Sequence, residues 1–317
     1  MSEFDLIRKH FTRPTNHTHL GIGDDAALIS ISAGMELAVS TDMLVAGTHF
    51  FADVNPHKLG WKSLAVNLSD MAAMGAKPKW ATLSISLPEN DTHWLALFSQ
   101  GFFSCANAFD VDLIGGDTTR GALCINVQIM GEIPVGQAIR RSGAKVDDDI
   151  WVSGKLGCAA LGLAHLLGKE QIAANIVEHH VQALHSPQPR VALGLALRGL
   201  ANSCLDISDG LLSDLGHIAK ASDVGAEIQL DAIPSSTYIK KKLKNPAFQQ
   251  YVLAGGDDYE LCFTASPNHS AEVQAAAKAA NVQIAKIGKI TANKDLLVLD
   301  GTGNPIEIAQ TGYNHFN

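Results

Sequence analysis

The stretch NPHKLGWKSLAVNLSDMAAMG, residues 55–75, predicts a long helix with defined ends. Pro56 suits the first turn of a helix, and Gly75 suits the position just after the last turn. Asp70 lies inside this helix among neighbours that are almost all small or apolar. Burying a carboxylate is costly unless a cation or hydrogen-bond donors compensate for the lost water. Asp70 is therefore the first candidate for a functional residue.

Strands and helices mix on both sides of this helix. The first part of the chain predicts an amphipathic helix over 2–11, a helix over 92–109, and strands over 36–45, 80–87, 111–116 and 124–133. The second part predicts helices over 157–167, 190–200, 211–222 and 270–280, and strands over 150–154, 203–207, 226–230, 259–265, 284–290 and 296–299. This mixture predicts a fold of the α/β or α+β class.

The stretch PVGQAIRRSGAKVDDD, residues 134–149, is polar and rich in glycine between two apolar strands. It predicts a domain boundary, since 317 residues leave room for two domains. We expect an N-terminal α/β domain over 1–136 and a C-terminal α/β domain over 137–317.

The composition disfavours several classes of protein. The net charge of −8 disfavours a general nucleic-acid binder. No apolar run approaches the roughly 18 residues of a membrane span, and no targeting segment is visible. The five cysteines are scattered and never spaced as C-x-x-C, which argues against a disulfide framework or a zinc knuckle. We expect a cytoplasmic protein that binds neither membrane nor nucleic acid.

Aspartates recur beside glycine, serine or threonine in apolar stretches: Asp24, Asp25, Asp42, Asp70, Asp117, Asp206 and Asp209. Two carboxylates 4 Å apart repel by about 4 kcal/mol at an effective dielectric of about 20. Magnesium would relieve that repulsion, since it prefers oxygen ligands and shares them with phosphates. Five of these aspartates also have an ordinary structural interpretation. These readings are a helix cap for Asp209, turns for Asp25 and Asp117, a solvated strand end for Asp42 and a backbone contact for Asp70.

Two common phosphate-binding signatures are missing from the chain. It has no G-x-x-x-x-G-K-[ST] loop and no protein-kinase H-R-D-x-x-x-x-N or D-F-G set. A nucleotide would therefore be held mainly through metal ions. Arg141 is the best candidate for a cationic side chain that binds the phosphates, although it is also typical of an ordinary exposed arginine in a linker.

Eight segments in order resemble the thiamine-monophosphate kinase family: GIGDDAAL, VSTDMLVAGTHF, LAVNLSDMAAMGA, LIGGDTTRG, RSGAK, LDISDGLLSDLGHI, GGDDYELCF and GYNHF. The resemblance runs from about residue 20 to the C-terminus. The wider superfamily includes aminoimidazole ribonucleotide synthetase, selenophosphate synthetase and a hydrogenase maturation factor. GTHF and GYNHF favour the thiamine branch.

The resemblance implies a two-domain PurM-like fold whose N-terminal sheets pair across a homodimer. It implies ATP-dependent phosphorylation of thiamine monophosphate to thiamine diphosphate, with several Mg²⁺ ions. Metal positions carry over to Asp25, Ser40, Thr41, Asp42, Asp70, Asp117, Asp206 and Asp209. Nucleotide contacts carry over to Gly116, Asp117, Arg141 and Ser208. Substrate contacts carry over to His49, Asp257 and Tyr313. Asp42, Asp70 and Asp117 are the expected catalytic residues.

One residue departs from the family pattern. The family usually reads G-G-E-D-Y-E-L, whereas this chain has Asp257 in place of the glutamate. Aspartate is one methylene shorter, so Asp258 or a water molecule would have to compensate. Ordinary readings remain for the substrate residues as well: a turn for Asp257, core packing for Tyr313 and a surface position for His49.

The expected mechanism is an in-line attack of the acceptor phosphate on the γ-phosphorus, without a covalent phospho-enzyme. A general base is scarcely needed, since a phosphate monoester with a second pKa near 6 is largely dianionic at neutral pH. The alternatives are another superfamily activity, such as amidine or selenophosphate formation, and a silent nucleotide-binding regulator. Selenophosphate chemistry would favour a cysteine in the first 100 residues, which hold none. A nicotinamide dehydrogenase is disfavoured because GIGDDA lacks the third glycine of G-x-G-x-x-G.

Overall fold

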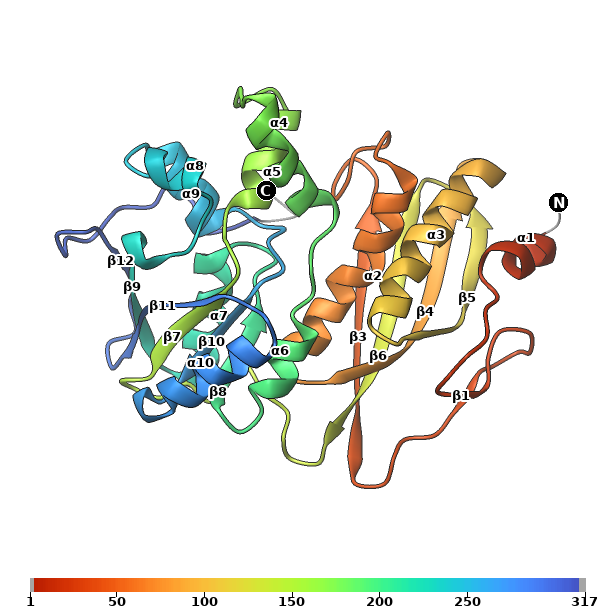
Figure 1. Ribbon diagram of the computed structural model, residues 1–317, viewed down its shortest axis with the longest axis horizontal. Helices are drawn as coiled ribbons and strands as arrows, with labels where there is room; N and C mark the ends of the chain where they lie inside the picture. Colours follow the sequence, from red (N-terminus) through yellow and green to blue (C-terminus); the bar gives the residue numbers. More distant parts are fainter. Residues whose placement is uncertain (1–2, 314–317) are drawn as a thin grey trace. The chain divides into compact units, whose positions relative to one another are not determined.

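The computed structural model describes residues 3–313 and divides the chain into two compact units. Unit 1 holds the residues as far as Met71 together with Ala76–Gly136, and unit 2 holds Ala72–Gly75 and the chain from Gln137 onward. Each unit mixes helices and strands, which confirms the predicted class (Figure 1). In the described part of the chain, no helix combines the length and the apolar character needed to cross a membrane.

Unit 1 is built on a sheet with the strand order β3-β6-β4-β5. β3 and β4 both pair antiparallel with β6, and β5 pairs parallel with β4. The elements of this unit are α1 (Glu3–His10), β1 (Thr18–Leu20), β2 (Leu28–Ile29), β3 (Met35–Val45), α2 (Pro56–Ala73), β4 (Lys77–Leu87), α3 (Thr92–Ala108), β5 (Asp112–Arg120) and β6 (Cys124–Pro134).

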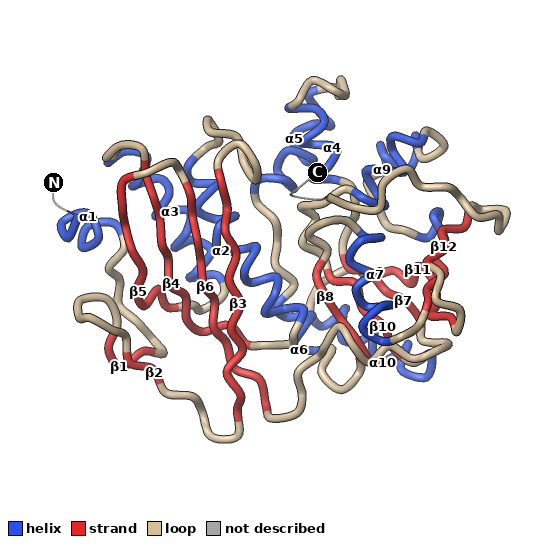
Figure 2. The backbone as a smooth tube through the Cα atoms, turned by 180° about the vertical axis from the view of Figure 1, so that it is seen from behind, coloured by secondary structure: helices blue, strands red, loops and turns tan. Residues whose placement is uncertain are grey.

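The helices α2 and α3 cover one face of this sheet, and the other face is visible from behind (Figures 1 and 2). Side chains alternate along a strand, so every second residue faces the helices. On that face Leu83, Ile85 and Val127 are buried. On the opposite face of the edge strand β3, Leu37 and Val39 are exposed.

Local sequence fixes how the two helices sit on the sheet. Gly75 follows α2 with φ +66°, the left-handed conformation that glycine adopts without strain and that commonly ends helices. Gly60 and Gly101 bring α2 and α3 together so closely that a Cβ on either would overlap the backbone of the other helix. Asp91 starts α3 by accepting hydrogen bonds from the backbone N–H groups of His93 and Trp94.

Unit 2 is built on a sheet with the strand order β12-β9-β11-β7-β10-β8, in which only the β12–β9 pair is parallel among the described residues. Its helices are α4 (Cys158–Leu166), α5 (Ala174–His185), α6 (Val191–Ala196), α7 (Leu211–Ser222), α8 (Thr237–Lys242), α9 (Pro246–Ala254) and α10 (Ser270–Ala279), with the short 3₁₀ turns η1 (Leu230–Ala232) and η2 (Pro267–His269). Its strands are β7 (Asp149–Ser153), β8 (Ala201–Asp206), β9 (Gly225–Gln229), β10 (Leu261–Ala265), β11 (Ile284–Thr291) and β12 (Leu296–Leu299).

A large apolar core joins this sheet to its helices. Ile150 and Val152 from β7 meet Leu211 and Leu215 from α7 in this core, together with Phe248 from α9. Because these side chains are all buried, the loops at the strand ends start from fixed positions. The loop between β8 and α7 carries several of the predicted site residues.

Two expectations about aspartates at strand ends were wrong. β3 ends at Val45, as predicted, so Asp42 lies inside the strand and not at its end, and β5 includes Asp117 rather than ending before it. The reason is sheet pairing: Asp42 pairs with Val127 and Asp117 pairs with Ser84, and the ladder holds both residues extended. The elements α5, α8, α9, β1 and β2 were not predicted.

Candidate active site

The first group of predicted residues joins β3 to α2. Asp42 lies beside Asp70, whose Oδ2 accepts a hydrogen bond of 2.6 Å from the Ser40 hydroxyl. The Asn67 amide oxygen accepts from the Asp42 backbone N–H at 3.1 Å. Burial, with the neighbouring Asp70 carboxylate, raises the pKa of Asp42 to about 7. Two acidic groups are thus held close together at a site that disfavours negative charge on both.

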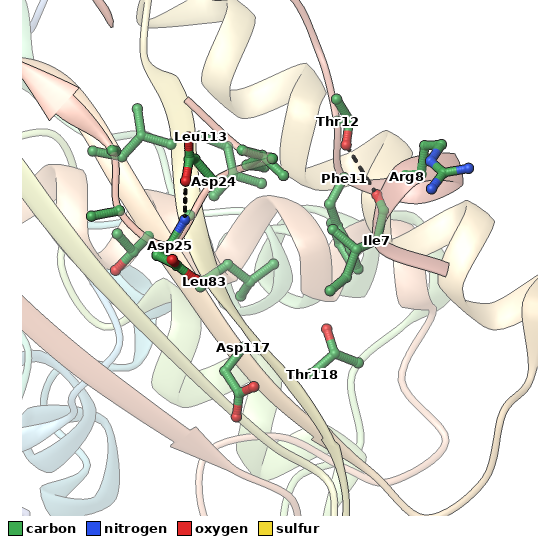
Figure 3. A pocket seen from close by; sticks show the side chains of 18 residues that line it. Ile7, Arg8, Phe11, Thr12, Asp24, Asp25, Leu83, Leu113, Asp117 and Thr118 are labelled. Carbon is green, nitrogen blue, oxygen red and sulfur yellow. Dashed lines mark hydrogen bonds between the residues drawn. The ribbon is translucent and has the colours of Figure 1, made fainter. Parts of the chain in front are cut away.

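The second group lines a cavity of about 810 Å³ in unit 1 (Figure 3). Asp24 and Asp25 come from the loop between β1 and β2, and Asp117 comes from β5. The Asp24 carboxylate accepts from the Asp25 backbone N–H at 2.9 Å. An apolar wall is formed by Ile7 from α1 and by Phe11, just after this helix, and both lie across the cavity from the Asp24–Asp25 loop.

The sheet keeps these two groups apart. β3 and β5 are its two edges, so Asp42 and Asp117 are separated by three strand spacings, or about 14 Å. Asp42 shares its row with the buried Val127 and Leu83 on the helix-covered face, whereas Asp117 pairs with Ser84 on the other face. The predicted carboxylates of unit 1 therefore form two groups.

Neither group supplies a complete coordination shell for a metal ion from its own side chains. Within residues 3–313, no set of three or more His, Cys, Asp or Glu side chains is placed to hold a metal ion. Both groups nevertheless consist of oxygen donors, which suits Mg²⁺, an ion that usually completes its shell with water and substrate phosphates. A cation beside Asp42 and Asp70 would also offset their repulsion. The donor chemistry therefore fits magnesium at each place.

Three other predicted residues of unit 1 have defined local roles. Gly116 has φ +146° and lies so close to β4 that a Cβ would overlap the backbone of Leu83. The Thr41 hydroxyl donates to the Val127 carbonyl at 3.1 Å, which places it in the sheet ladder. The His49 ring accepts from the Val45 backbone N–H at Nδ1, at 3.0 Å. A neutral ring bonded in this way carries its proton on Nε2, which can donate.

In unit 2, the predicted residues surround the loop between β8 and α7. Asp206 is the last residue of β8, and Asp209 precedes the helix. The helix cap is Gly210 rather than Asp209, so the reading of Asp209 as a cap was wrong. Sequence reasoning missed Asp214, whose buried Oδ2 accepts from the backbone N–H groups of Ser208, Asp209 and Gly210 at 3.0, 3.1 and 3.2 Å.

Two of the predicted substrate residues, Asp257 and Tyr313, form backbone hydrogen bonds with the same loop. The Asp257 N–H donates to the Ser208 carbonyl at 2.9 Å, and the Tyr313 N–H donates to the Asp209 carbonyl at 3.0 Å. Asp257 has φ +66°, a left-handed conformation that aspartate tolerates better than most residues. Tyr313 is 50% exposed, so it is not a core residue. The rest of the GYNHF segment, residues 314–317, lies outside the described residues.

Two further expectations can be placed. Arg141 is exposed, in the loop that precedes β7, and its carbonyl accepts from the Ser222 hydroxyl at 3.4 Å. Asp258 was expected to compensate for the short Asp257 side chain, but its carboxylate accepts from the Gly157 N–H at 2.8 Å, at the start of α4. Burial raises the pKa of Asp258 well above its usual range. Its hydrogen bond to Gly157 directs the side chain toward α4 rather than toward a ligand of Asp257.

Comparison with known proteins identifies relatives along almost the whole chain. Residues 23–133 match the family model described as AIR synthase related protein, N-terminal domain, and residues 145–300 match the corresponding C-terminal domain. The thiamine-monophosphate kinase of Escherichia coli K12 is 45% identical over 99% of this chain and 98% of its own.

Solved structures agree with these matches. A thiamine-monophosphate kinase from Stenotrophomonas maltophilia superposes with a TM-score of 0.84 at 43% identity, covering 93% of this chain and 94% of its own. A structure titled "AaThiL complexed with AMPPCP and TMP" superposes with a TM-score of 0.79 at 29% identity, covering 99% of this chain and 96% of its own. The predicted PurM-like fold is thereby confirmed.

Proposed function

This chain belongs to the thiamine-monophosphate kinase family, and from that premise we propose that it transfers the γ-phosphoryl group of ATP to thiamine monophosphate. The products would be thiamine diphosphate and ADP, as a step in thiamine diphosphate biosynthesis. The observation that carries the proposal is the 45% identity over 99% of the chain. The related protein captured with AMPPCP and TMP adds support, because its name specifies an ATP analogue and TMP.

The cavity of unit 1 suggests how ATP is oriented. Its volume of about 810 Å³ falls in the range of ligand pockets, roughly 300–1,000 Å³. Ile7 and Phe11 offer an apolar wall for the nucleobase, and Asp25 and Asp117 lie on other walls of the same cavity. We propose that the base lies against α1 and that the phosphates extend toward the aspartates, where the Gly116 backbone would contact the nucleotide.

We propose that several Mg²⁺ ions are held by two sets of oxygen donors in unit 1 and by a third in unit 2. Bound Mg²⁺ would neutralise the phosphates of donor and acceptor, whose mutual repulsion is the first obstacle to the reaction. The proposed ligands are Asp25 and Asp117 in the cavity, Ser40, Thr41, Asp42 and Asp70 at the β3–α2 group, and Asp206 and Asp209 in unit 2. Ser208 and Arg141 would contact the nucleotide.

The acceptor side of the reaction needs recognition of a phosphate and of a cationic heterocycle. His49 can donate from Nε2 to the phosphate, since its Nδ1 is occupied by the Val45 N–H. The half-exposed ring of Tyr313 offers a face to the positively charged thiazolium. Asp257 adds a carboxylate, and its backbone bonds to the same β8–α7 loop as that of Tyr313. Because the acceptor is already an anion, we propose direct in-line transfer, catalysed by positioning and by charge stabilisation.

We further propose a homodimer formed through the open face of unit 1. On the edge strand β3, Leu37, Val39 and Met43 are 43%, 52% and 55% exposed and share that face. A row of exposed apolar side chains on an edge strand is a hazard unless a partner covers it. A second copy of this chain is the partner that the family resemblance implies. Substitution Val39→Glu should convert dimer to monomer in analytical ultracentrifugation, and an unchanged mass would contradict this interface.

The cytoplasm is the compartment we propose for this reaction. All five cysteines are unpaired thiols, four of them buried. Disulfides are rare in reducing compartments, so free thiols suit the cytoplasm. The proposed co-substrate ATP is consistent with the same location.

The direct test of the function is release of ADP from ATP with thiamine monophosphate as acceptor. The expected result is stoichiometric thiamine diphosphate and ADP. A panel of acceptors, including selenide and the formamide-type substrates of amidine-forming relatives, separates thiamine phosphorylation from other superfamily activities. Turnover with a panel member and none with thiamine monophosphate would overturn the proposal, as would nucleotide binding without any turnover.

A further inference from the structure

The loop between β8 and α7 in unit 2 is held by one buried carboxylate. A single oxygen of Asp214 accepts hydrogen bonds from three consecutive backbone N–H groups, those of Ser208, Asp209 and Gly210. The Asp214 side chain is 5% exposed, and a buried oxygen that accepts three hydrogen bonds holds all three of its donors in place. The three amides are therefore fixed in a common direction.

This arrangement holds the segment that leads into α7. The cap position of α7 is Gly210, which has no side chain to accept a hydrogen bond. Unsatisfied backbone N–H groups at a helix N-terminus attract anions. Asp214, from the first turn of the same helix, accepts from the Gly210 N–H and from the two N–H groups before it. These three amides are thus closed to phosphate.

The carbonyl side of the same loop is held by the segments that carry the proposed substrate residues. The Ser208 carbonyl accepts from the Asp257 N–H, the Asp209 carbonyl from the Tyr313 N–H, and the Ile207 carbonyl from the Tyr259 N–H at 2.8 Å. Ser208 and Asp209 therefore have both backbone groups engaged. What they can offer to a ligand is the hydroxyl of one and the carboxylate of the other.

We propose that Asp214 is a positioning residue for phosphoryl transfer. By holding the loop, it directs the Ser208 hydroxyl toward the nucleotide and the Asp209 carboxylate toward a metal ion. The same loop holds the backbones of Asp257 and Tyr313, so all four side chains keep a fixed arrangement. This inference rests on the proposed function, because it assigns those side chains the roles given above. Asp214 itself touches no reactant. Its influence passes through the three amides, since a misplacement of about 1 Å can cost up to about 100-fold in rate.

Two substitutions separate positioning from bulk stability. Asp214→Ala removes the acceptor, whereas Asp214→Asn retains one oxygen that can accept from the same amides. Asp300 provides a matched control in the same unit, because its Oδ1 accepts from the backbone N–H groups of Thr302 and Asn304 at 2.8 and 3.0 Å in an exposed turn. Asp300→Ala removes the same kind of hydrogen bond away from the loop.

The experiment combines steady-state kinetics with amide hydrogen exchange of residues 205–212. For Asp214→Ala we expect about 10- to 100-fold lower kcat, a higher Mg²⁺ requirement and faster exchange in this loop. Asp214→Asn should recover slow exchange and most of kcat, and Asp300→Ala should leave both unchanged. If Asp214→Ala is unfolded, Asp214→Asn decides: fast loop exchange with full activity overturns the proposal.

The outcome also distinguishes this inference from the proposed function. If the wild-type protein shows no turnover with thiamine monophosphate, the function fails, yet loop exchange still reports whether Asp214 holds the three amides. If the wild type is active and Asp214→Ala is folded with unchanged kcat and unchanged Mg²⁺ dependence, the function stands and the positioning role is overturned.

Discussion

Two regions of this chain surround their carboxylates in different ways. In unit 1, Asp42 lies beside Asp70, and Asp24, Asp25 and Asp117 line a single cavity. In unit 2, three buried acids lie among hydrogen-bond donors. Asp214 takes three backbone N–H groups, Asp258 takes one from Gly157, and Glu260 takes the Arg190 guanidinium and the Ser153 hydroxyl. We propose that a cation completes the first arrangement, whereas the second has its donors within the protein.

This contrast concerns what surrounds each carboxylate. Where the neighbour is another carboxylate, as at Asp42 and Asp70, the two groups repel and a bound cation can relieve that repulsion. Where the neighbours are N–H groups, as at Asp214, the side chain holds the backbone and contributes to shape. Both environments occur in unit 1, where the buried Asp112 accepts two backbone N–H hydrogen bonds. Substitutions in the two environments should affect different measurements.

The largest expected effect comes from the Asp42–Asp70 pair. Asp42→Asn and Asp70→Asn each remove a proposed metal ligand while preserving shape, so the proteins should fold normally. Loss of an electrostatic group at the reacting centre typically costs about 100- to 1,000-fold in kcat. We expect losses of that order, with altered Mg²⁺ dependence, in the ADP-release assay. Thermal stability should not fall, because each substitution removes repulsion between two neighbouring carboxylates.

Glu89 supplies the control for this pair. It is an exposed acid in the same unit, in the connection between β4 and α3. Glu89→Gln changes the net charge by the same amount and should leave kcat unchanged. Near-wild-type kinetics in both Asp42→Asn and Asp70→Asn would refute a metal site at β3 and α2.

The opposite result is expected for Glu260 in unit 2. Glu260 is 6% exposed and forms a bidentate pair with Arg190. Glu260→Gln leaves the guanidinium without its counter-charge, and breaking a buried pair costs about 3–5 kcal/mol. Urea denaturation should show a loss approaching that size, whereas kcat of the folded protein should change little. A large loss of kcat with unchanged stability would break the contrast between the units.

An intermediate effect is expected at the apolar wall of the nucleotide cavity. Ile7→Ala removes a partly exposed apolar side chain against which the base is proposed to lie. Covering such a side chain is worth about 1.5–3 kcal/mol, so the KM for ATP should rise about 10-fold. The KM for thiamine monophosphate should stay constant, and this difference separates a nucleotide contact from general damage. Equal changes in both constants would contradict the proposed orientation.

The smallest effect concerns pH and a histidine outside the proposed site. The buried His180 ring contacts the Ile176 carbonyl through Nδ1 and the Ser236 hydroxyl through Nε2, both at 2.9 Å. Burial, together with the nearby His179 and Lys155, lowers the pKa of His180 below its usual value, against the opposing effect of the Ile176 carbonyl. The neutral ring therefore stabilises the fold fully above the unfolded pKa of about 6.5. That stability is lost as the pH falls further.

Urea denaturation at several pH values checks this linkage. The free energy of unfolding of the wild type should decline as the pH falls below about 6.5, and His180→Gln should show a shallower decline. A steeper decline in the variant would contradict the assignment. Turnover at neutral pH should be unaffected, as expected for a group that supports shape.

Much of the fold could be predicted from residue patterns. The helix over 55–75 was recognised from Pro56, Gly75 and its apolar character, and α2 spans Pro56–Ala73. Alternation and β-branched residues identified the strands that became β3, β4 and β6. The helix α5 was not predicted. It has no side-chain cap, so the usual start signal is missing.

The site was harder to predict, because the sequence shows where a carboxylate occurs but not which groups surround it in the fold. Asp25, Asp42, Asp70 and Asp117 were all selected as one set, yet strand order places them in two groups on different faces of a sheet. Asp214 was missed, although an acid in the first turn of a helix that follows glycine could have indicated an acceptor for nearby backbone N–H groups. Only the folded backbone decides which carboxylates meet N–H groups.

The central claim is that the carboxylates of unit 1 hold metal ions for phosphoryl transfer. Its most direct test is anomalous diffraction from crystals grown with Mn²⁺ and a non-hydrolysable ATP analogue. We expect anomalous peaks within about 2.3 Å of carboxylate oxygens, both at Asp42 and Asp70 and in the cavity at Asp25 and Asp117. Bound nucleotide with no anomalous peak at either place would contradict it.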